Sequence, residues 1–292
     1  MVLLALFPAL LIGLVFLGFH LANFFSKEKL PFSDINHAAI QFIPFVLAGV
    51  LVWFIIAWFS NSRMIQRATG SQPLERKENK RVYNLLENLC ISKGIPVPRL
   101  FIIPDDSLNA FASGINKDSF SISLSRGIIE KLNDEELEGV IAHELTHIRN
   151  RDVRLLIVSI IFVGIFAFIS QMAFRSIRFS GRGKKDTGVL ILVVLVVALL
   201  GWLLSSLFRF SISRKREYMA DAGAVELTKR PEALASALEK ISSDSRIEAV
   251  EREDVAQLFI DHPLDKTKSS MLHSIFATHP PIEKRIQVLR QF

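Results

Sequence analysis

The chain has 292 residues, of which 50% are hydrophobic and 22% are charged, and its formal net charge is +6. Its mean hydropathy of +0.34 is high for a soluble protein with that share of charged residues, so we expect membrane spans joined to an ordinary soluble domain. The basic residues gather at the ends of apolar segments, which argues for contact with a lipid bilayer and against nucleic-acid binding. Cys90 is the only cysteine, which excludes an intramolecular disulfide.

Four apolar segments predict membrane helices, because about 20 apolar residues cross a bilayer as a helix. Residues 1–25 have no Lys or Arg before the apolar run, unlike a signal peptide, and we interpret them as a retained span. Residues 38–59 form the second span. Residues 155–174 and 189–208 form a second pair, although spanning would export the basic stretch 175–188, against the positive-inside rule.

Shorter elements are predicted between and after these segments. Periodicity of 3.6 or 2 residues, with Pro, Gly and Asn at the ends, distinguishes helices from strands. Residues 242–278 have no clear period, and we expect a flexible or regulatory stretch there. The predicted helices are 74–93, 231–241 and 280–289, and the predicted strands are 100–103, 109–112 and 119–124.

The sequence His-Glu-x-x-His begins at His143 and ends at His147. An N-cap at Asn133, followed by three acidic residues and a helical apolar pattern, predicts a helix across it. Residues four apart lie on one helical face, so both imidazoles can bind one metal ion. Zinc suits such a site and lowers the pKa of a bound water towards ~7, and Glu144 can take the proton as the water attacks a carbonyl.

A third protein ligand is needed to complete such a site. Glu217 and Asp221 are also four residues apart on a predicted helix, so their carboxylates share one face. Glu217 can complete the metal shell, and Asp221 can accept the other ring N–H of a ligand histidine. The same spacing is common on solvated helices, so these roles depend on the His-Glu-x-x-His motif.

The stretches HELTHIRNRD (143–152) and SRKREYMADAGA (213–224), with NAFASG (109–114) and HPPIEKRI (279–286), resemble the HtpX membrane zinc metalloproteases. These are gluzincins related to the CAAX-prenyl endopeptidases. The resemblance implies a mainly α, α+β zincin-like protease domain with a small mixed sheet, fused to four hydrophobic membrane helices. It implies one Zn²⁺ per chain, bound by His143, His147 and Glu217, with Glu144 as the general base and Asp221 behind the ligands.

Two further sites follow from the resemblance. His279 is a candidate for stabilising the oxyanion, and the alternative is that it only caps the terminal helix. The stretch Asn109, Ala110, Phe111 and Ala112 is a candidate edge strand for an extended substrate, and the alternative is a core hairpin without a substrate role.

The metal ligands also constrain the topology, because they must all lie on one side of the membrane. The expected organisation is two transmembrane helices in 1–60, the first part of the protease domain in 61–154, a helical hairpin in 155–208 and the second part of the protease domain in 209–292. Basic residues near the span ends place the active site in the cytoplasm. The resemblance implies that the membrane is a bacterial plasma (inner) membrane.

The function expected is a multi-pass zinc endopeptidase for quality control of misfolded or damaged membrane proteins, with self-cleavage as a further expectation. One alternative is a processing protease for a dedicated or lipid-modified substrate. Another is a non-enzymatic membrane scaffold with a structural metal, which the intact set of five motif residues disfavours. The sequence leaves the oligomeric state open.

Overall fold

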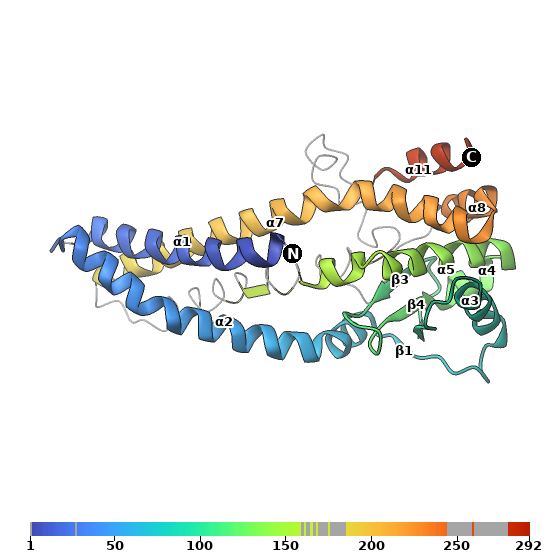
Figure 1. Cartoon of the computed structure of the whole chain (residues 1–292), viewed down its shortest axis with the longest axis horizontal. Helices are drawn as coiled ribbons and strands as arrows, with labels where there is room; N and C mark the ends of the chain where they lie inside the picture. Colours follow the sequence, from blue (N-terminus) through green and yellow to red (C-terminus); the bar gives the residue numbers. More distant parts are fainter. Residues whose placement is uncertain are drawn as a thin grey trace. The chain divides into compact units, whose positions relative to one another are not determined.

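The computed structural model describes residues 2–26, 28–158, 185–243 and 280–292, with a few isolated residues such as Phe259. They form two compact units. The first contains Met1–Phe59 and Ser159–Phe208, and the second contains Ser60–Val158 and Arg209–Phe292. The chain is mainly helical with one small sheet (Figure 1).

Two of the described helices are long and apolar enough to cross a membrane: α1 (Val2–Phe25), in the first unit, and α2 (Phe32–Thr69), which begins in the first unit and ends in the second. The imidazole Nε2 of His20 lies 3.0 Å from Oδ1 of Asn36, so a hydrogen bond joins them. Phe45 and Phe59 on α2 are 74% and 79% exposed, as expected of apolar side chains that face lipid.

The prediction of four membrane helices is not confirmed. Among the described residues only α1 and α2 have the length and composition of a span. Residues 155–174 lie largely outside the described part of the chain. Residues 189–208 are helical within α7 (Lys185–Thr228), where the apolar stretch found, Val194–Leu203, is shorter than a span.

The helix that contains the predicted second span, 38–59, is longer than the span: α2 begins at Phe32 and continues for ten residues after Phe59. The residues after Phe59 are polar but tolerate helical geometry, and the helix ends only before Gly70, whose φ of 65° is left-handed. At 1.5 Å per residue the 38 residues of α2 extend about 57 Å, well beyond the ~30 Å hydrocarbon core of a bilayer.

The second unit is built on a four-stranded mixed sheet with the order β1-β2-β4-β3. The strand β2 is parallel to β4, while β1 and β3 are antiparallel to their neighbours. Of these strands, β3 is therefore at one edge of the sheet. The strands are β1 (Gln72–Pro73), β2 (Arg99–Ile103), β3 (Ala110–Ser113) and β4 (Ser121–Ser125).

Five helices pack with this sheet or with each other. The helix predicted at 74–93 begins later, because Asn79 caps it by accepting a hydrogen bond from the amide of Val82. The predicted strands and the two later helices are present, with ends shifted by one or two residues. The helices are α3 (Lys80–Lys93), α4 (Arg126–Lys131), α5 (Asp134–Arg149), α8 (Pro231–Ser243) and α11 (Ile282–Leu289).

Helix α5 carries the His-Glu-x-x-His sequence, and its start is strongly defined. Asn133 caps it as predicted, and the side chain of Glu136 accepts a hydrogen bond from the backbone amide of Asn133 in return. This reciprocal capping box satisfies two amides that the helix leaves without partners. The other carboxylate contacts of Glu136, from Ser236 Oγ and Lys240 Nζ, both over 2.7 Å, join α5 to α8.

Candidate metal centre

Helix α5 places both histidines of the motif on one face. His143 is fully buried and His147 is partly exposed. Their Nε2 atoms are 3.1 Å apart, and their rings stand nearly perpendicular, at 86°. Both Nε2 atoms therefore reach the same small volume.

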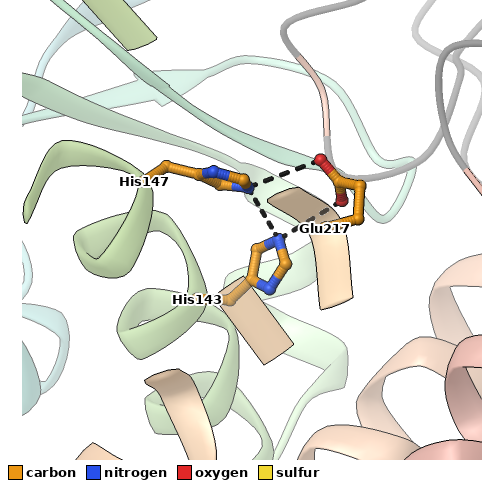
Figure 2. Close-up of side chains that lie close together, drawn as sticks. All are labelled: His143, His147 and Glu217. Atoms are coloured by element: carbon orange, nitrogen blue, oxygen red, sulfur yellow. Dashed lines mark hydrogen bonds and ion pairs between the residues drawn. The ribbon is translucent and has the colours of Figure 1, made fainter. Parts of the chain in front are cut away.

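Glu217 on α7 faces that volume from the opposite side (Figure 2). Its Oε2 is 3.7 Å from His143 Nε2 and its Oε1 is 3.5 Å from His147 Nε2. Ligand atoms held about 2 Å from one tetrahedral ion are about 3.3 Å apart. The three measured separations of 3.1, 3.5 and 3.7 Å lie close to that value, and the two imidazoles and one carboxylate are a donor set that zinc accepts.

A glycine lets α7 come close enough to α5 to supply Glu217. A Cβ atom at Gly223 would lie 2.4 Å from Cγ2 of Thr146 and 2.9 Å from its Oγ1. Thr146 is fully buried between the two histidines on α5, and its hydroxyl donates to the carbonyl of Ala142. Any side chain at residue 223 would therefore push the two helices apart.

Each histidine has an aspartate behind its other ring nitrogen. Nδ1 of His143 is 3.0 Å from Oδ1 of Asp221, and Nδ1 of His147 is 3.2 Å from Oδ2 of Asp152. Such contacts fix the ring orientation and leave Nε2 for the metal. Asp221 was named from the sequence as the partner of a ligand histidine, whereas the contact of Asp152 with His147 was not expected.

Each of these aspartates is in turn bound by an arginine. Arg216 Nη1 donates to Asp152 Oδ1 over 2.7 Å. Arg285 on α11 is 1% exposed and donates to both oxygens of Asp221, over 2.9 and 2.7 Å, while its Nη1 is 3.2 Å from Glu217 Oε2. The role of Arg285 was not predicted from the sequence. The available signal was its position within HPPIEKRI, one of the stretches that resemble the family.

The acidic groups around His143 favour a positive charge on its imidazole. Burial lowers the pKa of His143, but its hydrogen bonds to Asp221 and Glu217 outweigh burial and raise the pKa to about 9. Burial would raise the pKa of Asp221, but Arg285 and His143 lower it to about 2. The Asp221 carboxylate is therefore ionised at neutral pH, as the support of a metal ligand must be.

Glu144 is 2% exposed and lies next to the two histidines. Burial raises its pKa, while His143, His147 and a hydrogen bond from the backbone amide of Ala112 act in the opposite direction. The carboxylate is therefore held between the histidines and strand β3. A base in this position can take a proton from a water molecule beside the three donor atoms.

The four residues expected to bind substrate lie at or beside β3, and all are buried. Asn109 precedes the strand, and its Oδ1 accepts a hydrogen bond from the amide of Ala110. Ala110, Phe111 and Ala112 lie within the strand, and the backbone amide of Ala112 is hydrogen-bonded to Glu144. His279 lies outside the described residues.

The model of peptidase family M48 matches residues 76–292, which include every residue of this site. The chain belongs to peptidase family M48. Because this match spans most of the chain, the protein is a metalloprotease. His143, His147 and Glu217 form a possible site for its metal ion.

Relatives within this M48 group are named alike. The "Protease HtpX homolog" of Bacteroides fragilis (strain YCH46) is 59% identical over 305 aligned positions, covering 100% of this chain and 94% of that protein. The homologues of Dictyoglomus turgidum and Lactobacillus helveticus are 39% and 38% identical, covering 87% and 84% of this chain and 85% and 84% of their own. The chain is therefore an HtpX-type M48 protease, and with α1 and α2 these relatives indicate a membrane protein.

One solved structure is similar over most of the chain. The crystal structure of S. mikatae Ste24p aligns with a TM-score of 0.49 and 21% identity. The alignment covers 98% of this chain and 64% of Ste24p, so the chain spans somewhat less than two thirds of that protein's length.

Proposed function

We propose that the chain is a membrane-bound zinc endopeptidase that hydrolyses peptide bonds with one Zn²⁺ held by His143, His147 and Glu217. The observation that carries this proposal is the spacing of the three donor atoms, 3.1, 3.5 and 3.7 Å, with a buried carboxylate next to them. When bound, zinc acts as a Lewis acid that activates water and polarises the substrate carbonyl.

The protein supplies the remaining steps. Glu144 takes the proton of the attacking water and passes it to the leaving amine, as a general base and then a general acid. Asp221 and Asp152 hold the two imidazoles in the orientation that leaves Nε2 towards the reaction. The edge strand β3 orients an extended substrate by backbone pairing, and His279 donates to the developing oxyanion.

The proposed substrates are unfolded or damaged proteins of the membrane, cut in segments close to the bilayer, which is a quality-control role. The resemblance to HtpX supports this role, as do two helices that are long and apolar enough to cross a membrane. The alternative is specific processing of one dedicated substrate, which uses the same chemistry. The number of different substrates that the enzyme cleaves distinguishes the two functions.

The active site is proposed to face the cytoplasm of a multi-pass inner-membrane protein. Arg63 and Arg67 near the end of α2 support this orientation by the positive-inside rule. A cysteine introduced at Ser180, between the third and fourth apolar segments, tests with membrane-impermeant maleimide whether the second pair of segments crosses the membrane. Labelling from outside supports four crossings, and labelling only from the cytoplasm refutes the crossing of the second pair.

The decisive experiment compares wild type with Glu144→Gln, both solubilised in detergent, stripped with chelator and reloaded with zinc. Glu144→Gln keeps all three ligand side chains, so it should bind zinc stoichiometrically and yet fail to cleave casein. Zinc-dependent cleavage by wild type alone supports the proposal. Full activity in Glu144→Gln would remove the proposed base. Bound zinc without cleavage by wild type would favour a dedicated substrate.

A further inference from the structure

The edge strand β3 is paired, at one residue, with a residue from far along the same chain. Phe259 forms an isolated antiparallel bridge with Phe111, the second residue of β3. The two rings meet edge to face, with centroids 4.7 Å apart at 64°. Both side chains are fully buried, and such aromatic contacts add to the attraction that burial alone provides.

This pairing lies directly beside the reaction site. Ala112 follows Phe111 in the strand, and its backbone amide donates to the carboxylate of Glu144. Successive residues of a strand are only about 3.3 Å apart along it. A chain paired with Phe111 therefore runs within a residue or two of the proposed base.

The residues of β4 that pair with Phe111 and with Ser113 are small. On the other side of β3, the residue of β4 that faces Phe111 is Ser123, and Ser113 faces Ser121. These serines are small, and residues two apart in a strand share one face of the sheet. The aromatic partner that the described residues provide for the Phe111 ring is Phe259.

We propose that the Phe111 edge of β3 is a substrate subsite for a large apolar side chain, preferably aromatic, and that Phe259 occupies this subsite in the resting chain. This inference rests on the proposed function, because it assigns part of the substrate to β3. A polypeptide pairs with β3 as an added antiparallel strand and places a Phe-like side chain where Phe259 now lies. Substrates rich in apolar residues, such as unfolded segments of membrane proteins, displace Phe259 most readily.

The bridge to Phe259 adds to the burial that α5 and β4 already give to β3. The residues of β3 expected to bind substrate, Ala110, Phe111 and Ala112, are each at most 3% exposed. An edge that binds substrate must open, and the intramolecular bridge is the contact that has to be exchanged. The alternative is that Phe259 belongs permanently to the sheet, in which case no substrate reaches this edge.

The test measures the accessibility of residue 259 in a chain that binds substrate without cutting it. The variant Glu144→Gln/Phe259→Cys is loaded with zinc and treated with maleimide, with and without a peptide that carries a central Phe in an apolar sequence. Cys90, the only native thiol, is buried and its pKa is raised to about 11 by burial, so Glu144→Gln alone gives the background. Phe101→Cys on β2, separated from β3 by β4, is the matched control.

We expect the Phe peptide to raise the labelling rate of residue 259 about tenfold, and the same peptide with Ser in place of Phe to raise it far less. The rate at residue 101 should not change. In otherwise wild-type protein, Phe259→Ala should lower KM for the Phe peptide about threefold to tenfold with kcat retained, because the competing side chain is gone.

Two results would overturn the inference. One is an unchanged labelling rate at residue 259 with a peptide that the wild type cleaves. The other is a loss of kcat and of thermal stability in Phe259→Ala without any fall in KM, as expected of a permanent strand. If zinc-loaded wild type cleaves neither peptide nor casein, the proposed quality-control role fails, and the subsite for apolar substrates fails with it.

Discussion

The guanidinium group of Arg285 donates two hydrogen bonds to the carboxylate of Asp221, from Nε to Oδ2 over 2.9 Å and from Nη2 to Oδ1 over 2.7 Å. The two side chains are 1% and 3% exposed. A bidentate pair of this kind is directional as well as strong. It connects α11 to the residue that orients His143, so the proposed metal ligands depend on a helix that carries none of them.

Replacement of Arg285 should therefore weaken metal binding. Arg285→Gln leaves Asp221 and Glu217 buried without their cation, and we expect zinc affinity to fall about 10- to 100-fold and stability to fall by about 3–5 kcal/mol. Arg285→Lys keeps the charge but cannot form the paired hydrogen bonds of the guanidinium group. Its losses of zinc affinity and stability should therefore be smaller than those of Arg285→Gln. Chelator competition and thermal unfolding in detergent measure the two effects.

The control for this prediction is Arg290→Gln, just after α11, where the ion pair with Glu239 is exposed and worth little. In a double-mutant cycle, Asp221→Asn with Arg285→Gln should cost less stability than the sum of the single changes, because the two variants remove both charges of one pair. Wild-type zinc affinity in Arg285→Gln would contradict the prediction.

Asp152 should matter to the metal although it is not a ligand. Asp152→Asn weakens the contact that orients His147 and the ion pair with Arg216, so we expect about a tenfold loss of zinc affinity with the fold retained. Circular dichroism and chelator competition give the two readouts. Asp106→Asn, which breaks an exposed pair with Arg126, should leave affinity unchanged. Equal effects of the two variants would argue against an orienting role.

The approach of α7 to α5 predicts a steric rescue. Gly223→Ala places a methyl group 2.4 Å from Cγ2 of Thr146, so Glu217 should move away from the histidines and both zinc affinity and activity should fall at least tenfold. Thr146→Ala removes the opposing atoms and should restore much of the loss in the double variant. A double variant as impaired as Gly223→Ala would show that the clash lies elsewhere.

Glu136 should make the stability of the protease unit depend on pH. Burial raises its pKa, but hydrogen bonds from Lys240, Ser236 and the amide of Asn133 outweigh burial and lower the pKa below 4.5. A lowered pKa means that the folded state prefers the ionised form. Its stabilising contribution is present above pH 4.5 and is lost as pH falls through the lowered pKa.

Thermal unfolding at a series of pH values checks this prediction. Glu136→Gln should lower the unfolding midpoint at pH 7, and the difference from wild type should shrink below pH 4.5. Glu135→Gln alters the preceding residue, whose ion pair with Arg230 is exposed, and serves as the control. A constant difference at all pH values would mean that Glu136 acts through packing rather than charge.

Local sequence signals predicted the elements that local interactions define. The start of α5 could be predicted because Asn133 and the acidic first turn are sequence neighbours that interact directly. The grouping of His143 with His147 followed from helical spacing, and Glu217 was placed with them by ligand chemistry and by resemblance to a family.

The remaining features depend on tertiary contacts between distant parts of the chain. Arg285 was expected only on a packing helix, because nothing near it in the sequence shows that Asp221 lies against it. The bridge of Phe259 to Phe111 has no local signal. The short β1 exists only because Gln72 and Pro73 pair with β2. The length of α2 was missed because hydropathy marks where apolar residues stop, not where a helix stops.

The position of Arg285 also sets an order of assembly during synthesis. The ribosome makes His143 and His147 first, then Glu217 and Asp221, and Arg285 after all of them. A nascent chain that has not yet reached residue 285 holds two acidic side chains whose buried counter-charge is still missing. The proteolytic centre therefore forms only after α11 has been made. Until then the chain cannot cleave the unfolded nascent chains that are being made nearby.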